Sequence, residues 1–304
     1  MKKWIALVLS LLLVLGLCAC DAQPQNTDGG EQTPAGNEVS DGASGCIPEG
    51  GSYVLADGTR LEAGSPFPAA PSVGDIYRYG DYEYRYGQHK GESQKWEATD
   101  GHWGVYVRDT EKTNYGQILD EILGKPITSV CGTFRKCQQM TSAPAIPATV
   151  TNMSHTFYEC SALVTAPQIP EGVTDMAWCF NACSALTSAP ELPDAVQKLT
   201  STFRDCVSLT EAPQIPAGVT RLSSMFEGCT NLSKVNVTIP ESVEEMDRMF
   251  YSCANLSGTV TINAEPIKYT HCFYWVDFST QDLTLTGSSS LLRAIGNTGK
   301  NYPG

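Results

Sequence analysis

The chain has 304 residues, and its 33 Asp and Glu against 20 Lys and Arg give a net charge of −13 at pH 7. This acidic balance argues against a nucleic-acid binder, because phosphate backbones are bound by clusters of Lys and Arg. A hydrophobic content of 41% suffices for a globular core, while 27 Gly and 18 Pro exclude a coiled coil or a polytopic helical membrane protein.

The first twenty residues have the pattern of an export signal. Two lysines precede an apolar run over residues 4–17. As a helix this run is roughly 21 Å long, short of the roughly 30 Å hydrocarbon core of a bilayer. The run ends in Leu17-Cys18-Ala19-Cys20, which resembles the lipobox of bacterial lipoproteins. The resemblance implies a signal peptide over residues 1–19, a lipid on Cys20 and a protein anchored to the outer face of the cell membrane. The alternative is an ordinary secretory signal with incidental cysteines.

Residues 20–45 are expected to form the lipidated cysteine and a disordered linker. After Cys20 the stretch consists mainly of small and polar residues, with five acids and no base. Such a segment cannot bury enough apolar surface to order itself. As a flexible coil it has a mean reach on the order of 25–30 Å, so the folded part is expected to stay close to the membrane.

Residues 46–126 predict a small β-rich N-terminal domain or cap. Residues 74–86 alternate around Gly80-Asp81, which predicts a hairpin with Tyr79 opposite Tyr82, Tyr77 opposite Tyr84 and Arg78 opposite Glu83. Residues 103–108 have the same period, and residues 115–123 predict one short helix.

The aromatic residues of this region have two interpretations. A solvent-facing aromatic platform would bind cell-wall or host glycan through Tyr77, Tyr79, Tyr82, Tyr84, Trp96 and Trp103. Alternatively, the tyrosine face packs on its own sheet or caps the following domain.

From about residue 127 the chain repeats itself. Phe recurs with spacings of 23 residues and one of 24, at Phe134, Phe157, Phe180, Phe203, Phe226, Phe250 and Phe273. The best copy, residues 157–176, reads F-x-x-C-x-x-L-x-x-A-P-x-I-P-x-x-V-T-x-M, whereas the last copy loses its Cys at Val276. A period of 23 is too short for two helices and fits one coil of a leucine-rich-repeat-type solenoid. The fold class expected is therefore mainly β with short helical turns, with about seven coils over residues 127–287 and a C-terminal cap or tail over residues 288–304.

The way in which the A-P-x-I segment changes in the late copies indicates where each coil has its strand. The late copies carry apolar alternation at residues 235–239, 260–262 and 283–285, so the A-P-x-I columns of the early copies are also expected to be short strands. The F-x-x-C segment favours a helical turn on the opposite side. Between the inward columns runs an outward one, formed by Ala145, Gln168, Glu191, Gln214, Thr238, Thr261 and Thr284.

The repeat resembles the BspA-like leucine-rich-repeat family of bacterial surface proteins, through Phe157, Cys160, Leu163 and the Ile169-Pro170-x-x-Val173 segment. The resemblance implies a curved solenoid and adhesion to extracellular host or matrix proteins. The chain departs from the family in its Ala-Pro pairs, which stand in the first four copies where a hydrophobic strand residue is more usual. Its small copy number is a second departure and limits the adhesive reach.

Twelve cysteines in an exported chain would ordinarily suggest disulfides. Six form one column of the repeat, where a small apolar side chain is expected to be buried as a thiol. Cys131, Cys179 and Cys272 lie off that column, and Cys46 stands alone and is a candidate for intermolecular pairing. Cys179-x-x-x-Cys183 has nearly finger-like spacing, but no second pair follows, so neither a metal nor another cofactor is expected.

A binding protein is the leading functional hypothesis, because a rigid core carries changing residues at fixed positions. The sequence contains no Walker loop and no G-x-S-x-G elbow, so an enzyme is not expected, although an active site within residues 46–126 remains a third alternative. The candidate ligand-binding residues come from the outward column and from the pair after each Phe: Gln168, Glu191, Gln214, Thr238, Thr261, Thr284, Tyr158 and Arg204.

Overall fold

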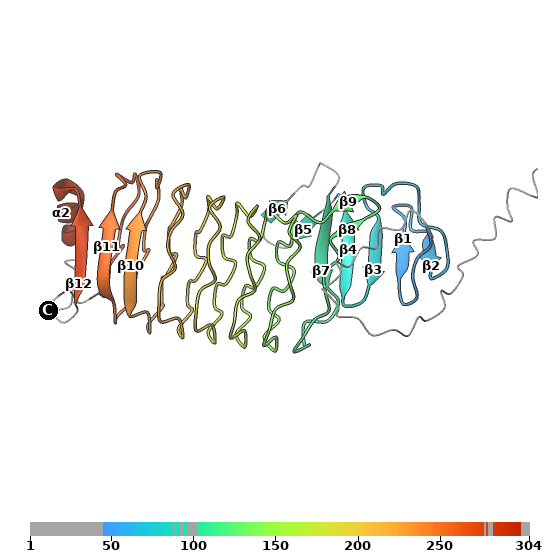
Figure 1. The fold of residues 1–304 in the computed structure, drawn as a ribbon, viewed down its shortest axis with the longest axis horizontal. Coiled ribbons are helices and arrows are strands. Elements are labelled where there is room, and N and C mark those ends of the chain that lie inside the picture. The colour runs from blue at the N-terminus through green and yellow to red at the C-terminus, as the bar shows by residue number, and fades with distance from the viewer. Residues whose placement is uncertain are drawn as a thin grey trace, which may run out of the picture.

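A computed structural model describes residues 45–87, 89–91, 94–96, 102–276, 278 and 282–298, without the side chains of 89–91, 94–96 and 296–298. The expected signal, lipidation site and most of the linker lie outside this range. The described part is an elongated body in which an N-terminal sheet and a stack of coils lie end to end (Figure 1). None of its helices is long and apolar enough to cross a membrane.

The N-terminal part is built on an antiparallel five-stranded sheet with the order β2-β1-β3-β4-β7. Its strands are β1 (Ser52–Val54), β2 (Arg60–Glu62), β3 (Ile76–Tyr79), β4 (Tyr82–Tyr86) and β7 (Trp103–Val107). Two small hairpins pair β5 (His89–Gly91) with β6 (Gln94–Trp96) and β8 (Glu121–Ile122) with β9 (Lys125–Pro126). The register of β3 with β4 confirms all three cross-strand pairs expected from the sequence.

The tyrosine face of this sheet is its core. Tyr77, Tyr82, Tyr84 and Trp103 are at most 1% exposed, and Tyr79 is half-buried against Tyr77. The exposed aromatic platform is therefore wrong for these residues, and the alternative interpretation, packing within the protein, holds. The side chain of Trp96, the remaining member of the platform, lies outside the described atoms.

The short helix expected over residues 115–123 is wrong. Ile118, Leu119 and Ile122 are buried at the spacing of a helix face, but the Leu119 amide donates to the hydroxyl of Tyr84 (3.1 Å) instead of to a carbonyl one turn earlier. The segment then enters the β8–β9 hairpin, whose turn holds Gly124 at φ 67°. Docking on the tyrosine core outweighs the helical periodicity.

The sheet continues directly into the repeats. Gly104 of β7 forms a parallel bridge with Ser129, and the Thr133 hydroxyl donates to the carbonyl of Val105 at 2.8 Å. Tyr82 packs edge-on against Phe134, with ring centroids 6.2 Å apart. One continuous core thus runs through both parts.

Successive coils are joined by a backbone ladder at the Phe segment. The N–H groups of Val130, Gly132, Phe134 and Lys136 donate to carbonyls 22 residues later, such as Thr156 for Phe134. Thr133 and Arg135, which lie between them, donate to carbonyls three positions back, as Arg135 does to Gly132. The backbone reaches this alternation by a positive φ two residues before and two residues after each Phe, including Trp178 at 61° and Ala182 at 58°. A left-handed residue interrupts a helix, so the expected helical turn is instead a series of tight turns.

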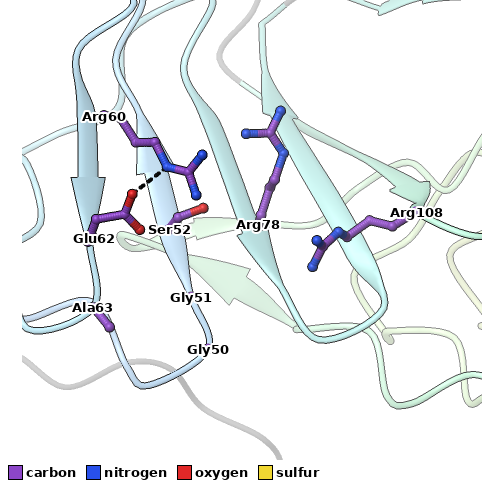
Figure 2. Close-up of a pocket in the computed structure, with 8 residues that line it drawn as sticks. All are labelled: Gly50, Gly51, Ser52, Arg60, Glu62, Ala63, Arg78 and Arg108. Carbon is purple, nitrogen blue, oxygen red and sulfur yellow. Dashed lines mark ion pairs between the residues drawn. The ribbon is translucent and has the colours of Figure 1, made fainter.

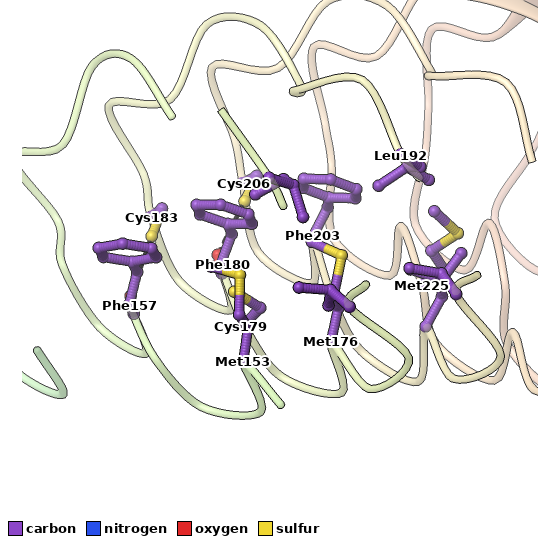
Figure 3. Close-up of a cluster of buried hydrophobic side chains, with 14 of the residues drawn as sticks. Met153, Phe157, Met176, Cys179, Phe180, Cys183, Leu192, Phe203, Cys206 and Met225 are labelled. Carbon is purple, nitrogen blue, oxygen red and sulfur yellow. Dashed lines mark hydrogen bonds between the residues drawn. The ribbon is translucent and has the colours of Figure 1, made fainter. Parts of the chain in front are cut away.

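The Phe side chains form a single file inside the stack (Figure 3). Neighbouring rings from Phe134 to Phe273 are stacked with centroids 5.2 to 5.8 Å apart, and all are at most 2% exposed. From Cys160 onward each column thiol donates to a Phe carbonyl of the preceding coil, as Cys206 does to Phe180 at 3.1 Å. The column cysteines are buried thiols, as expected from the repeat.

These thiols are expected to resist alkylation in the folded protein. Burial raises the pKa of Cys183, Cys206 and Cys253 well above its usual range, so the reactive thiolate is scarcely populated. Iodoacetamide labelling followed by peptide mass mapping should modify these sites slowly in buffer and rapidly in denaturant. The half-buried Cys131 should be labelled earlier. Equal labelling of Cys206 and Cys131 in buffer would contradict a buried column.

The strand prediction holds only for the late copies. β10 (Lys234–Ile239), β11 (Ser257–Ile262) and β12 (Leu283–Gly287) form a parallel sheet. The earlier A-P-x-I segments form no strand in the described chain, and on this side of the coils the described bridges are single ones, such as that of Ser142 with Thr165. Each early segment carries two prolines, and a proline cannot donate to a ladder.

A helix closes the stack. α2 (Ser289–Thr298) begins after Ser288, whose hydroxyl accepts the amide of Leu291 at 3.3 Å and so acts as the N-cap. Leu291 and Ile295 lie one turn apart and are both buried. The cap expected over residues 288–304 therefore includes an amphipathic helix that covers the open end of the core.

Candidate functional site

The outward column of the repeats reaches solvent as the sequence predicts. Gln168, Glu191, Gln214, Thr238 and Thr284 are exposed, and Thr261 is half-buried between its neighbours. The first three line a concave surface, whereas Thr238, Thr261 and Thr284 lie on the regular sheet formed by β10 to β12.

The concave surface is a groove between two proline-containing segments. It has a volume of about 670 Å³ and runs between residues 187–194 and residues 210–217. A smaller hollow of about 160 Å³ continues it toward Gln168 and Glu171. Glu191 belongs to both, so it lies at the centre of what we call the acidic groove, defined by Glu171, Glu191, Asp194 and Glu211 with the segments that carry them.

A row of single backbone bridges on this side of the coils is interrupted at the groove. Bridges join Ser142, Thr165 and Ser188 in succession and then Glu211 with Lys234, but none joins Ser188 to Glu211 within the part of the chain that the structure describes. In that same part the amides of Glu191, Leu192 and Ile215 donate no hydrogen bond. Unbonded backbone donors beside a groove remain available to water or to a bound chain.

The charge of the groove is uniformly negative. Its lining contains Glu171, Glu191, Asp194 and Glu211 and no Lys or Arg. Lys234, outside the lining, pairs with one of these acids, with its Nζ 3.8 Å from a carboxylate oxygen of Glu211, and both side chains are more than two-thirds exposed. Such an exposed pair contributes little, so the groove keeps its negative potential.

Gln214 has a structural contact as well as an exposed position. Its Nε2 donates at 2.8 Å to the carbonyl of Asn236, which lies on β10. Pro213 directly precedes Gln214 in the chain. The side chain thus satisfies a strand carbonyl that the proline segment leaves without a backbone donor.

Tyr158 and Arg204 lie apart from the groove, on the turns that carry the Phe residues. Tyr158 contacts His155 and Trp178, with centroids 6.0 and 6.2 Å away, and those two rings are stacked 5.9 Å apart. Arg204 pairs at 3.2 Å with the buried carboxylate of Glu227, which also holds Arg248 at 3.5 Å. The candidate residues therefore divide between two surfaces. His155 and Trp178 were missed, although both occupy the position two residues before a Phe.

His155 is expected to make stability decline in mild acid. Burial lowers its pKa below 6.5, aided by the charge of Arg135 and opposed by Asp175. The unfolded chain therefore takes up the proton first as pH falls. The contribution of the neutral imidazole to the stability of the fold is complete above about pH 6.5 and is lost as pH falls below it. The free energy of unfolding, measured with urea at pH values from 7 to 5, should fall more steeply with pH in the wild type than in His155→Gln. The two slopes should differ by at most about 1.4 kcal/mol per pH unit. Equal slopes in the two proteins would contradict this assignment.

Cys179 and Cys183 do not belong to a metal-ligand set among the described residues, where no three His, Cys, Asp or Glu side chains lie close enough to share an ion. Cys183 instead donates to the carbonyl of Phe157 at 3.1 Å.

The file of Phe rings, the Cys ladder and the coil stacking define a leucine-rich-repeat solenoid. The family model for the BspA-type leucine-rich-repeat region matches residues 127–224 and 154–280 with six copies. The chain belongs to this family.

Several solved bacterial leucine-rich-repeat proteins are similar to the chain. The Treponema pallidum leucine-rich-repeat protein TpLRR is 20% identical, with a TM-score of 0.51 over 71% of this chain and 93% of that one. A leucine-rich-repeat protein from Bacteroides ovatus is 20% identical and covers 68% of this chain, with a TM-score of 0.45. A leucine-rich cell surface protein from Faecalibacterium prausnitzii is 22% identical over 68% of this chain, with a TM-score of 0.47. The match spans about half the length of the latter two proteins, at 52% and 55%. At these identities the likeness concerns the fold alone. No curated protein matches the chain.

Proposed function

We propose that the protein binds an extended segment of another protein in the acidic groove and acts as a recognition or adhesion protein at the bacterial surface. The observation that carries this proposal is the groove itself, where a backbone bridge between neighbouring coils is absent and four carboxylates gather with no Lys or Arg in the lining. The ligand class follows from the charge, since a segment bearing Lys and Arg complements it.

The walls of the groove suit an extended chain. Pro190 and Pro213 are half-buried in the lining and present apolar ring surfaces, and the unbonded amides of Glu191 and Ile215 offer hydrogen bonds to peptide carbonyls. Main-chain hydrogen bonds of this kind give affinity, while the carboxylates select the side chains. The role is binding, and no catalytic step is proposed.

The location is part of the proposal. The lipobox-like Cys20 supports a lipid anchor, and the acidic linker supports a short tether between the anchor and the solenoid. Metabolic labelling with a palmitate analogue should mark the wild-type protein and fail to mark Cys20→Ser, with release of the variant into the medium. Equal labelling of both proteins would contradict an anchor at this residue.

The groove can be tested with two extended peptides, one alternating Lys with Thr and one alternating Glu with Thr. Fluorescence anisotropy with the full chain should show saturable binding of the Lys peptide only, weakening as salt is raised. Reversing charge in Glu191→Lys together with Asp194→Lys should weaken binding roughly tenfold or more.

A matched control reverses two exposed acids outside the groove, Glu241→Lys together with Glu265→Lys. This variant has the same net charge as the groove variant, and it should bind the Lys peptide within about twofold of the wild type. An equal loss of affinity for the Lys peptide in both variants would mean that net charge alone causes the effect, and it would contradict binding in the groove. Beads carrying the two variants should differ in the same sense in adhesion to immobilised matrix proteins.

A further inference from the structure

The outer face of the N-terminal sheet holds a pocket of opposite character. Side chains alternate along each strand, so Ser52 and Arg78 lie opposite the buried face that contains Tyr53 and Tyr77. In the register Ser52 stands between Glu62 of β2 and Arg78 of β3. Neighbouring strands thus bring together residues that are far apart in the sequence.

This pocket has a volume of about 520 Å³ and a floor of small residues. Gly50, Gly51 and Ser52 form the floor together with Ala63, and the rim is formed by the three arginines (Figure 2). Arg60 comes from β2, Arg78 from β3, and Arg108 follows β7 directly. The small residues leave open the space that the guanidinium groups surround.

The charge of the pocket is unusual for this chain. Three guanidinium groups line it against one carboxylate, that of Glu62, in a protein with a net charge of −13. Arg60 pairs with Glu62 at 2.5 Å, Arg78 pairs with Glu83 outside the lining at 2.7 Å, and Arg108 donates to the carbonyl of Gly80 at 3.2 Å. A guanidinium has five N–H donors, so each arginine retains donors beyond these contacts.

From this arrangement we infer that the pocket binds a phosphate group carried by a phosphoester. Glu62 and Glu83 offset the three guanidinium charges in part, and a doubly charged oxyanion would offset the rest. Guanidinium forks match the oxygen geometry of phosphate, and the Ser52 hydroxyl adds a further donor at the floor. The acidic groove cannot supply this chemistry, so the pocket is a second site that does not depend on the proposed protein partner.

The position of the pocket gives the phosphoester two possible sources. β1 and β2 lie at the end of the body opposite α2 (Figure 1), and Gly50 follows shortly after the expected linker of residues 20–45. A lipid headgroup would therefore be within reach of an anchored protein, and a soluble phosphoester would serve equally in chemical terms.

The test is isothermal titration calorimetry of the full chain with inorganic phosphate and with glycerol phosphate, in low-chloride buffer. Both should bind saturably, and Arg60→Gln combined with Arg108→Gln should weaken binding roughly tenfold or more. This pair leaves the contact of Arg78 with Glu83 intact, so the melting temperature should not change. Arg221→Gln removes an exposed arginine of the solenoid and should bind phosphate within about twofold of the wild type.

Vesicles distinguish the two sources. If the lipid headgroup is the ligand, more of the wild-type protein than of the double variant should sediment with phosphatidylglycerol vesicles. If the two proteins sediment equally while the wild type still binds phosphate in calorimetry, the ligand is a soluble phosphoester. All variants share the same N-terminal segment, so the difference between them reports the pocket. Absence of saturable phosphate binding, or an equal loss in Arg221→Gln, would overturn the inference.

Discussion

Replacing Phe180 by alanine is expected to lower the free energy of unfolding by about 3–5 kcal/mol. Its ring is fully buried and stacked between Phe157 at 5.2 Å and Phe203 at 5.7 Å, so truncation leaves a cavity bounded by two rigid rings. The coils above and below are held by the backbone ladder and cannot collapse into the space. Urea unfolding followed by circular dichroism measures the loss.

The conservative change Phe180→Leu serves as the control for this prediction. It keeps most of the volume and should cost less than half as much as the alanine variant. If Phe180→Ala cost under about 1 kcal/mol at an unchanged denaturant slope, the ring would not lie in a packed file.

Replacing Trp103 by alanine is the second large effect expected, again about 3–5 kcal/mol. The indole is fully buried in the N-terminal sheet, 5.0 Å from the ring of Tyr86, and its Nε1 donates to the carbonyl of Ile122 at 3.1 Å. Truncation removes this packing and leaves a buried carbonyl without its donor. Calorimetry should show a single transition at lower temperature, because β7 and the first repeat share one core.

Trp275→Ala is the matched control, since the same residue type stands 47% exposed at the far end of the stack. Its effect should be within about 0.5 kcal/mol. If Trp103→Ala produced a separate early transition while the repeats kept their melting temperature, the sheet and the repeats would not be coupled.

The sequence allowed the repeat core to be predicted almost residue by residue. A period of 23 residues places the repeated Phe, the Cys three residues after it and the Leu three residues further on in columns, and the structure buries each column. The hairpin register was equally accessible, because a two-residue turn at Gly80-Asp81 fixes which residues face one another. In both cases local spacing determines the answer.

Features set by distant contacts were not accessible in this way. The segment after Tyr115 has a helical spacing, but its amide finds Tyr84, which lies 35 residues away from Leu119. The left-handed residues on either side of each Phe include Trp178 and Ser201, residue types that do not indicate a positive φ from sequence.

The candidate site was predicted in part. Glu191 and its outward neighbours follow from the alternation of the repeat, whereas the groove around them lies where no bridge joins Ser188 to Glu211 in the described chain, and the repeat pattern gives no sign of that gap. The arginine pocket could not be foreseen, since the pairing of β1 with β2 and β3 depends on the three-dimensional order of the sheet. Neither Arg60 nor Arg108 belongs to a motif.

The most direct test of the stacked core is a double-mutant cycle on the Phe file. Phe157→Leu and Phe180→Leu remove two stacked neighbours, while Phe157→Leu and Phe250→Leu remove two rings separated by several coils. Unfolding free energies should show a coupling of about 0.5–1.5 kcal/mol for the first pair and additivity within about 0.5 kcal/mol for the second. Additivity for the neighbouring pair, or equal coupling in both cycles, would contradict a core built from rings in a single file.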